Sequence, residues 1–346
     1  GIIAARKRNE GTGIHMIDIS HPEIQFAVEA VRAGALLARE VEREMVEPAL
    51  TKDDRSPVTV ADFAVQGLIG CLLEKTFPEA ALVAEEDSTQ LREPDAELTC
   101  ARVAEYVGRR LAYATPQTVC AWIDHGNAEP CERFWTLDPI DGTKGFLRGD
   151  QFAVGLALIE NGQVTIGAIG CPNLSNAHLP DVGGPGTLLI AARGQGAWWQ
   201  PLDSDGELQP LRVSETGDTA GMRILRSFET GHTNVGRIER MSEAVGVDVE
   251  PVRMDSQAKY AVLASGHAEL LLRLLTSRQP DYRERIWDQA AGALITEEAG
   301  GRITDLDGKP LDFSAGRTLA NNRGICASNG RVHEVVLETL RQVCGE

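Results

Sequence analysis

Two aspartates three residues apart form the stretch of the sequence that is most suggestive of chemistry. They lie in Asp138-Pro-Ile-Asp141, which is followed at once by Gly142 and Thr143. Residues 134–137 are mostly apolar and include a β-branched threonine, so they predict a buried strand that ends at Asp138. Gly142 and Thr143 predict the start of a helix or a tight turn, whose free N–H groups can bind the oxygens of a phosphate. Carboxylates beside such N–H groups suit a phosphate held through a divalent cation.

Further acids lie where strands are predicted to end or helices to begin. Residues 80–84 predict a short buried strand that runs into Glu85 and Glu86. Strand ends of this kind carry binding sites in layered α/β proteins, although a solvated loop is the simpler interpretation. Asp62 and Asp288 are each expected in the first turn of a helix. For Asp62 the simpler interpretation is an acid that only stabilises the helix N-terminus.

If these acids meet in space, they form a site made only of oxygen ligands. Such a site suits a hard divalent cation, most naturally Mg²⁺, and the sequence has no His/Cys spacing typical of zinc. Two Mg²⁺ ions can activate a water molecule and stabilise the leaving oxygen of a phosphoryl group. Thr143 and Asp62 could then orient the attacking water, and no covalent intermediate would be needed.

The rest of the chain predicts alternating helices and strands. Apolar residues at steps of three and four predict a helix over 22–46. Two β-rich runs joined by Asn161-Gly162 predict a hairpin. Residues 88–131 are polar and irregular apart from a helix near 101–111, and they predict an insertion or lid. Other strands are expected at 187–192, 197–199, 224–228, 269–275, 303–305 and 324–327, and other helices at 234–245, 255–265, 284–299 and 332–343.

The length of 346 residues suggests two domains. Glycine and proline are dense at residues 181–186, which predicts a boundary there. We expect an N-terminal α+β domain over 16–182 that carries most of the acids, and a C-terminal α/β domain over 183–346 that carries Asp288. Residues 1–15 are expected to be a tag or a flexible segment.

Charge and cysteine content narrow the function classes. The net charge of −17 argues against binding to nucleic acid or to an anionic membrane, but a small phosphorylated ligand stays compatible with it. An odd count of seven cysteines without a CxxC pair argues against a disulfide framework, so we expect reduced thiols and a cytoplasmic protein. Cys100, Cys120 and Cys131 share one polar segment, where a redox-sensitive pair could form. No apolar run reaches the ~20 residues of a membrane span.

The motifs together resemble a known family. Asp138-Pro-Ile-Asp141-Gly-Thr143, with Glu85-Glu86 before it and Trp287-Asp288 after it, resembles the inositol monophosphatase superfamily of magnesium-dependent, lithium-sensitive phosphatases. Five longer segments closely resemble one branch of this superfamily, the 3′(2′),5′-bisphosphate nucleotidases. They are SPVTVADFAVQ, DPIDGTKGFLRGDQFAVGLALI, GAIGCPN, DSQAKY and RIWDQAAG. The matching segments span about residues 22–328. The resemblance implies a layered αβαβα sandwich of two domains with the active site between them.

The resemblance also implies an activity. The substrate would be adenosine 3′,5′-bisphosphate, cleaved at its 3′-phosphate to AMP and phosphate in sulfur metabolism, with 3′-phosphoadenylyl sulfate as a second substrate. The cofactor would be Mg²⁺, with two or three ions per site, and lithium would inhibit. The expected partner is this small nucleotide alone, with no nucleic acid or membrane, and the expected state is a monomer.

By position, the resemblance assigns roles to individual residues. The positions that match metal ligands are the carboxylates of Glu85, Asp138, Asp141 and Asp288 and the carbonyl of Ile140. Asp62 and Thr143 match the pair that activates water. The positions that match nucleotide contacts are His232, Ser256, Lys259, Arg273 and Asp288.

Simpler interpretations exist for the nucleotide contacts. His232 could be a solvated loop residue, Ser256 a helix cap and Lys259 a surface charge. Arg273 is more informative, because a guanidinium inside an apolar strand needs an anionic partner. Residues 88–131 match no clear family pattern, and residues 275–283 are slightly long, which bears on the lid and the adenosine pocket. The alternative functions are an inositol polyphosphate 1-phosphatase or inositol monophosphatase, and a non-catalytic nucleotide sensor.

Overall fold

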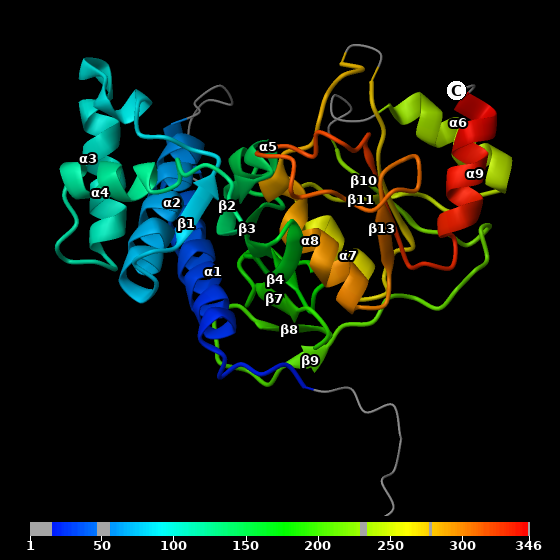
Figure 1. Cartoon of the computed structure of the whole chain (residues 1–346), viewed down its shortest axis with the longest axis horizontal. Coiled ribbons are helices and arrows are strands. Elements are labelled where there is room, and N and C mark those ends of the chain that lie inside the picture. Colours follow the sequence, from blue (N-terminus) through cyan, green and yellow to red (C-terminus); the bar gives the residue numbers. More distant parts are fainter. Residues whose placement is uncertain (1–15, 47–55, 229–233, 277–278, 345–346) are drawn as a thin grey trace, which may run out of the picture.

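The computed structural model describes residues 16–46, 56–228, 234–276 and 279–344. Its elements form five layers along the long axis of the molecule: helices, a sheet, helices, a second sheet and helices (Figure 1). Two sheets that each bury both faces against helices make one continuous stack. The predicted layered α/β sandwich is therefore confirmed.

The elements alternate along most of the chain. The helices are α1 Pro22–Val41, α2 Ser56–Thr76, α3 Glu97–Gly108, α4 Pro116–Asp124, α5 Thr143–Leu147, α6 Val235–Val245, α7 Ala258–Ala264, α8 Ile286–Glu298 and α9 His333–Cys344, with a π-helical turn at Glu42–Val46 and 3₁₀ turns at Gln90–Arg92 and Pro94–Ala96. The strands are β1 Ala81–Ala84, β2 Arg133–Asp141, β3 Ala153–Glu160, β4 Gln163–Cys171, β5 Leu174–Ser175, β6 Leu179–Pro180, β7 Thr187–Ala192, β8 Ala197–Pro201, β9 Gln209–Pro210, β10 Ile224–Arg226, β11 Val252–Arg253, β12 Leu270–Arg273, β13 Arg302–Thr304 and β14 Ile325–Ser328.

The first sheet has the strand order β1-β2-β3-β4-β7-β8-β9. β1 runs parallel to β2, and the later neighbours pair antiparallel. Helices α1 and α2 cover one face and α8 the other, so the central strands are buried on both sides. A strand covered on both faces is apolar throughout instead of alternating. This explains the unbroken apolar run at residues 153–159.

The predicted hairpin between β3 and β4 is confirmed. Its two loop residues, Asn161 and Gly162, have φ angles of 51° and 74°. A two-residue hairpin turn of type I′ needs positive φ at both positions, which asparagine and glycine adopt at low cost. The turn therefore fixes how β3 and β4 pair, and with them the centre of the first sheet.

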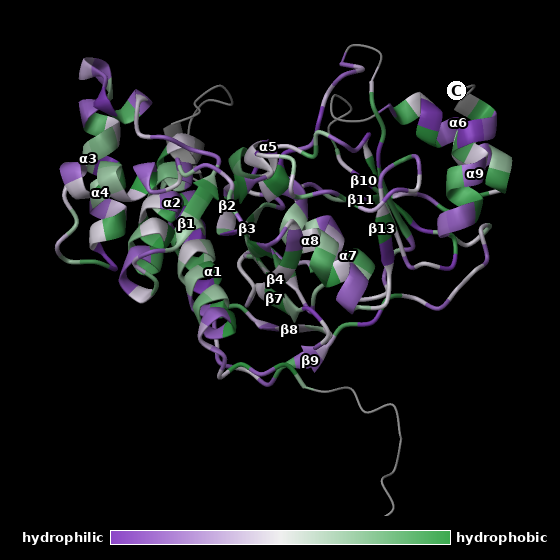
Figure 2. Cartoon of the chain, in the orientation of Figure 1, coloured by the Kyte–Doolittle hydropathy of each residue, from purple (hydrophilic) through white to green (hydrophobic). Residues whose placement is uncertain are grey.

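The second sheet has the strand order β11-β10-β12-β14-β13. Its inner side contacts α7 and α8, and α9 packs on its outer side together with α6. Figure 2 shows hydrophilic and hydrophobic bands side by side on α6 and α9, as expected for helices with one solvent-facing side. The apolar side chains between these helices and the sheet include Ile238, Met241, Leu272 and Val336.

Helix α8 lies between the two sheets and is packed closely on two sides. Gly167 of β4 faces it so tightly that an added Cβ would lie 3.0 Å from the Cα of Ala291. On the other side, a Cβ on Gly292 would lie 2.1 Å from the ring of Tyr260 in α7. Small residues at these contacts let α8 pack closely on β4 and on Tyr260, and α8 also contacts β2.

The prediction for residues 88–131 is only partly correct. The helix expected near 101–111 exists as α3, but the rest of the segment is not irregular, because α4 and two 3₁₀ turns fill much of it. Thr115 caps α4 and Pro116 follows in its first turn, a start signal that the sequence carried. Both helices pack on α2.

Two of the three cysteines of the predicted redox-sensitive segment lie in these helices. The sulfur atoms of Cys100 in α3 and Cys120 in α4 lie 3.8 Å apart as buried free thiols, whereas Cys131 is exposed. Burial raises the pKa of Cys100 to about 11, with Cys120 adding to the shift. A high pKa disfavours the reactive thiolate, so the redox role of these cysteines stays a prediction.

The predictions for the N-terminal segment and for the domain boundary are not tested by the described residues. Residues 1–15 lie outside the described residues. The boundary between residues 182 and 183 stays a prediction, and strands β7–β9 beyond it continue the first sheet. Among the described helices, none combines the length and the apolar character that a membrane span requires.

Gly70 in α2 offers a test of the packing between α2 and α4. An added Cβ there would lie 2.2 Å from the carbonyl oxygen of Trp122, whereas nothing lies within 4 Å of a Cβ on Gly108. We expect Gly70→Ala to lower the free energy of unfolding by about 1–3 kcal/mol through overpacking. Gly108→Ala should raise it by about 0.5–1 kcal/mol, because alanine costs less entropy in a helix. Urea unfolding of both variants checks this, and equal stabilities would contradict the packing.

Candidate active site

Glu85 and Asp138 lie at the same end of the first sheet because their strands are parallel neighbours. Ala84, the last residue of β1, pairs with Leu137 of β2, so the two acids follow at the same level. β2 does not end at Asp138 as predicted but continues to Asp141. Its pairing with β3 shifts between these two aspartates, which is the signature of a bulge. A bulge re-aims the side chains beside it, and the charge of Asp141 acts on Asp138.

Asp138 is the centre of the acidic cluster. Its side chain is only 2% exposed, and its Oδ1 atom has no hydrogen-bond partner. Loss of water raises the pKa of Asp138 well above its usual value, and the charges of Glu85, Asp141, Asp288 and Asp62 raise it further. A buried carboxylate with this environment binds a proton or a cation readily.

Glu85 and its neighbour Glu86 are fixed by α2. The Gln66 amide donates to the Glu86 carbonyl over 2.5 Å and accepts from the Glu86 N–H over 3.0 Å. Glu85 keeps contact with solvent, yet partial loss of water and the charges of Glu86 and Asp141 raise its pKa to about 7. Its position therefore follows from two hydrogen bonds made by the next residue.

Asp62 also comes from α2, one turn before Gln66. The helix begins at Ser56, so Asp62 lies in its second turn and the prediction of a first-turn position was wrong. Loss of water raises the pKa of Asp62, and Glu86 and Glu85 raise it further. The acid is therefore part of the cluster and does not act as a helix-terminal charge.

Gln257 connects two of the predicted ligands. Its backbone N–H donates to the Asp141 carboxylate over 2.6 Å. Its side-chain amide donates to the carbonyl of Trp287 over 3.2 Å, and Asp288 follows directly in the first turn of α8, as predicted. One residue of the second half of the chain thus holds both Asp141 and the start of α8.

Ser256 adopts the conformation that makes this connection. Its φ of 65° lies in the left-handed region, which is costly for a residue with a side chain. Across from it Gly142 has a φ of 90°, and an added Cβ there would lie 2.7 Å from the Ser256 Cβ. Ser256 therefore contacts the Gly142 turn, and α7 begins only at Ala258, later than predicted.

Gly142 and Thr143 begin helix α5, as the sequence predicted. Thr143 is exposed at its first position, next to the end of β2. The pairing of Thr143 with Asp62 stays a prediction. The bulge at the end of β2 leaves backbone groups near Ile140 out of the strand ladder, which is compatible with the predicted role of the Ile140 carbonyl.

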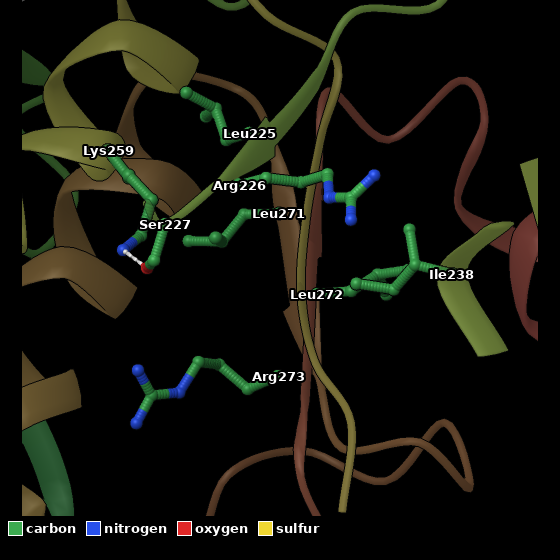
Figure 3. A pocket seen from close by; sticks show the side chains of 8 residues that line it. All are labelled: Leu225, Arg226, Ser227, Ile238, Lys259, Leu271, Leu272 and Arg273. Atoms are coloured by element: carbon green, nitrogen blue, oxygen red, sulfur yellow. Dashed lines mark hydrogen bonds between the residues drawn. The ribbon is translucent and has the colours of Figure 1, made fainter. Parts of the chain in front are cut away.

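Two cations lie beside the acids. Lys259 is 5% exposed and donates to the Ser227 hydroxyl over 2.8 Å (Figure 3). Burial and the charge of Arg273 lower the pKa of Lys259 to about 8, although Asp141 acts in the opposite direction. Because of this burial, Lys259 is not the surface charge of the simpler interpretation.

Arg273 lies at the end of β12, not in the middle of a strand as predicted. Figure 3 shows it extending toward the same side of β12 as Leu271, away from Leu272. Its anionic partner is Glu284, whose carboxylate lies 3.1 Å away and also accepts from Gln289. Burial alone would lower the pKa of Arg273, but Glu284 and Asp288 hold it above its usual value. The guanidinium is therefore already paired within the protein, and its contact with a nucleotide stays a prediction.

The cluster suits a divalent cation through its chemistry. Each side-chain donor is a carboxylate oxygen, and the buried Oδ1 of Asp138 lacks a hydrogen-bond partner. Mutual repulsion of the carboxylates is relieved by a positive charge, which an Mg²⁺ ion supplies. As the side chains stand, no three His, Cys, Asp or Glu residues of the described ranges are arranged to hold an ion. The acids are neighbours that a cation would have to draw together.

Comparisons with known proteins identify the family. The inositol monophosphatase family profile matches residues 20–344. The chain belongs to the inositol monophosphatase family. A curated relative from Schizosaccharomyces pombe, named 3′(2′),5′-bisphosphate nucleotidase, is 40% identical over 93% of this chain and 95% of its own length. One of the same name from Oryza sativa is 37% identical over 94% and 95%.

Solved structures of the family share the fold. An inositol monophosphatase from Thermotoga maritima superposes with a TM-score of 0.58 at 22% identity, covering 93% of this chain and 98% of that one. The inositol monophosphatase from Anabaena gives the same TM-score at 22% identity over 92% and 97%. At this identity the likeness describes the fold alone.

Several residues of the cluster were not predicted as part of it. Gln257 lies inside the DSQAKY segment, but it contacts Asp141 through its backbone N–H. The direction of that N–H depends on the left-handed conformation of Ser256. Gln66 follows Asp62 by one helical turn, and this spacing was a usable signal. Glu284 was the partner that the charge of Arg273 required. His232 lies outside the described residues.

The raised pKa values predict how the metal-free protein responds to pH. Carboxyls such as Glu85 and Asp138 hold protons more tightly when folded than when unfolded, so the folded state binds more protons. Stability therefore falls as pH rises from the unfolded pKa near 4.5 through the folded value near 7 of Glu85. We expect the Tm in EDTA to fall by a few degrees across this range, and Mg²⁺ to reverse the fall.

Glu85→Gln tests the origin of this effect. The variant cannot titrate at residue 85, so its Tm in EDTA should depend less on pH than that of the wild type. Differential scanning calorimetry at a series of pH values measures both. An identical pH dependence in the two proteins would contradict the assignment to Glu85.

Proposed function

We propose that this chain is a magnesium-dependent 3′(2′),5′-bisphosphate nucleotidase that hydrolyses the 3′-phosphate of adenosine 3′,5′-bisphosphate. The observation that carries the proposal is the cluster of acids around buried Asp138, beside the cations of Lys259 and Arg273. Acids suit a metal-held phosphate, and adjacent cations suit a second anionic group on the same ligand. The names of relatives at 37–40% identity support the same substrate.

The metal would be held by residues from three segments. These are the carboxylates of Glu85, Asp138, Asp141 and Asp288 with the carbonyl of Ile140, and we propose two or three ions. Bound Mg²⁺ lowers the pKa of water and stabilises the charge that develops on phosphoryl oxygens. The protein supplies the ligands at fixed positions, because Gln66 and Gln257 hold the segments that carry them.

Asp62 and Thr143 would act on the attacking water. Loss of water and the charges of Glu86 and Glu85 raise the pKa of Asp62, which makes its carboxylate a stronger proton acceptor than an exposed aspartate. The water oxygen forms a bond to phosphorus, the bond from phosphorus to the ribose 3′ oxygen breaks, and the proton reaches the leaving hydroxyl. The N–H groups of Gly142 and Thr143 would bind phosphoryl oxygens. No side chain becomes covalently attached to phosphate.

The remaining contacts would bind the nucleotide. Ser256 contacts the Gly142 turn, and Arg273 lies at the end of β12. Lys259 donates a hydrogen bond to the hydroxyl of Ser227. With His232 and Asp288 they form the proposed nucleotide side of the site. 3′-Phosphoadenylyl sulfate carries the same 3′-phosphate and is proposed as a second substrate. We further propose that the protein is a cytoplasmic monomer.

Asp141→Ala tests the catalytic proposal. Loss of a direct ligand should reduce phosphate release from adenosine 3′,5′-bisphosphate by more than the 10–100-fold typical of an outer-shell partner, so at least about 100-fold. A colorimetric phosphate assay with Mg²⁺ measures this. Asp205→Ala is the matched control, because the Asp205 side chain is 98% exposed. Equal rates in wild type and Asp141→Ala would reject the proposal.

The substrate assignment is tested with the wild type. Adenosine 3′,5′-bisphosphate should be hydrolysed with a higher kcat/KM than inositol 1,4-bisphosphate. A preference for the inositol compound would reject the substrate and keep the mechanism. Tight nucleotide binding without turnover under any divalent metal would instead indicate a sensor.

Lithium should inhibit the wild-type enzyme. The reason is that Li⁺ is a small hard cation, which oxygen ligands such as these carboxylates accept. Phosphate release measured at increasing LiCl, with KCl at equal ionic strength as the control, should fall only in LiCl. Full activity at high lithium would contradict the prediction.

A further inference from the structure

The guanidinium of Arg317 lies where three segments of the chain meet. Its Nη2 donates to the carbonyl of Ala84 over 2.5 Å, and its Nη1 donates to the carbonyl of Ala128 over 3.3 Å. The group also lies over the ring of Trp287, with 5.1 Å between the guanidinium carbon and the ring centroid. The fork shape of arginine allows all of these contacts from one planar group.

The first contact fixes the end of β1. Ala84 is the last residue of that strand, and its N–H donates to the carbonyl of Gly126 over 2.9 Å. Arg317 satisfies the carbonyl of the same residue. Glu85 follows at once, and Gln66 holds Glu86 on its other side. Glu85 is therefore placed between two hydrogen-bonded residues, of which one is held from α2 and the other from the second half of the chain.

The other contacts of Arg317 reach the start of α8. Its carbonyl oxygen accepts from the N–H of Ile286 over 3.2 Å, and its guanidinium covers Trp287. Asp288 is the next residue. Arg317 thus contacts the residues directly before Glu85 and directly before Asp288, although these two acids come from different layers of the fold.

We infer that Arg317 is a positioning residue that sets the separation of Glu85 and Asp288. The inference rests on the proposed function, because it takes these acids as metal ligands. Arg317 does not touch the metal or the substrate in this role. It acts through backbone carbonyls and a ring, so its geometry matters more than its charge, and lysine cannot replace it.

The variants that test this are Arg317→Lys and Arg317→Gln. Lysine keeps the charge and loses the fork, and glutamine loses both. The matched control is Arg193→Lys, because Arg193 also donates two hydrogen bonds to a backbone carbonyl, that of Val164, over 3.2 and 2.9 Å. Val164 lies in β4 next to the hairpin turn, whereas Asp141 pairs with Ala153 at the other end of β3.

Direct binding of Mg²⁺ by isothermal titration calorimetry is the first measurement, since it does not depend on turnover. We expect both Arg317 variants to bind Mg²⁺ about 10–100-fold more weakly than the wild type, as for other residues that orient metal ligands. The control should bind as the wild type does. At saturating Mg²⁺, the KM for adenosine 3′,5′-bisphosphate should stay unchanged in the Arg317 variants.

The Tm in EDTA separates positioning from general stability. An Arg317→Lys protein with the Tm of the Arg193→Lys control and weakened Mg²⁺ binding supports the inference. Mg²⁺ binding equal to that of the wild type in folded Arg317→Lys overturns it and leaves the proposed function intact. A wild type that binds no Mg²⁺ overturns the proposed function, and the inference with it.

Discussion

Crowding of like charges around Asp138 is the constraint on which the structure of the site depends. Carboxylates that have lost water repel one another strongly, because little solvent remains to screen them. The fold holds Glu85, Asp141 and Asp288 beside Asp138 in spite of this repulsion. Such an arrangement is stable only when protons or a cation neutralise part of the charge. The raised pKa values and the preference for a divalent metal are therefore two results of one arrangement.

The layers of the fold make this crowding possible. The acids come from the first sheet, from α2 on one side of it and from α8 on the other, so no single element carries more than two of them. Backbone contacts fix the elements relative to one another, through Gln66, Gln257 and close glycine contacts such as Gly167. The free energy that opposes the repulsion is thus distributed over the packing of the two hydrophobic cores on either side of the first sheet.

Much of the fold followed from local patterns in the sequence. The hairpin at Asn161-Gly162 and the buried runs of the first sheet were predictable because turn residues and apolar runs act over few residues. Helix α4 was missed because it is short and its polar flanks obscured its apolar face. Arg273 was misplaced within β12 because a strand end depends on partners far along the chain.

The site was predictable only in part for a related reason. Glu85 and Asp288 could be found as acids at a strand end and a helix start, whereas the expected positions of Asp62 and Asp138 within their elements were wrong and the family motif gave them their roles. The hydrogen bond from the Gln257 N–H to Asp141 depends on the left-handed backbone of Ser256, and serine gives no signal of that conformation. Contacts made by backbone groups, such as those of Arg317, leave no pattern in the side chains.

The parallel pairing of β1 with β2 also has a consequence for change over evolutionary time. Two parallel neighbouring strands need a crossover connection that returns along the length of the strand. Between β1 and β2 this connection contains α3 and α4. The relative placement of Glu85 and Asp138 is set by this pairing and by the last residues of the connection, since the carbonyl of Gly126 accepts from the N–H of Ala84. Closing a longer loop costs entropy that grows only with the logarithm of its length. The part of this connection before α4 can therefore lengthen, shorten or diverge in sequence among relatives, while the residues after α4 keep their contacts with β1 and the acids keep their geometry.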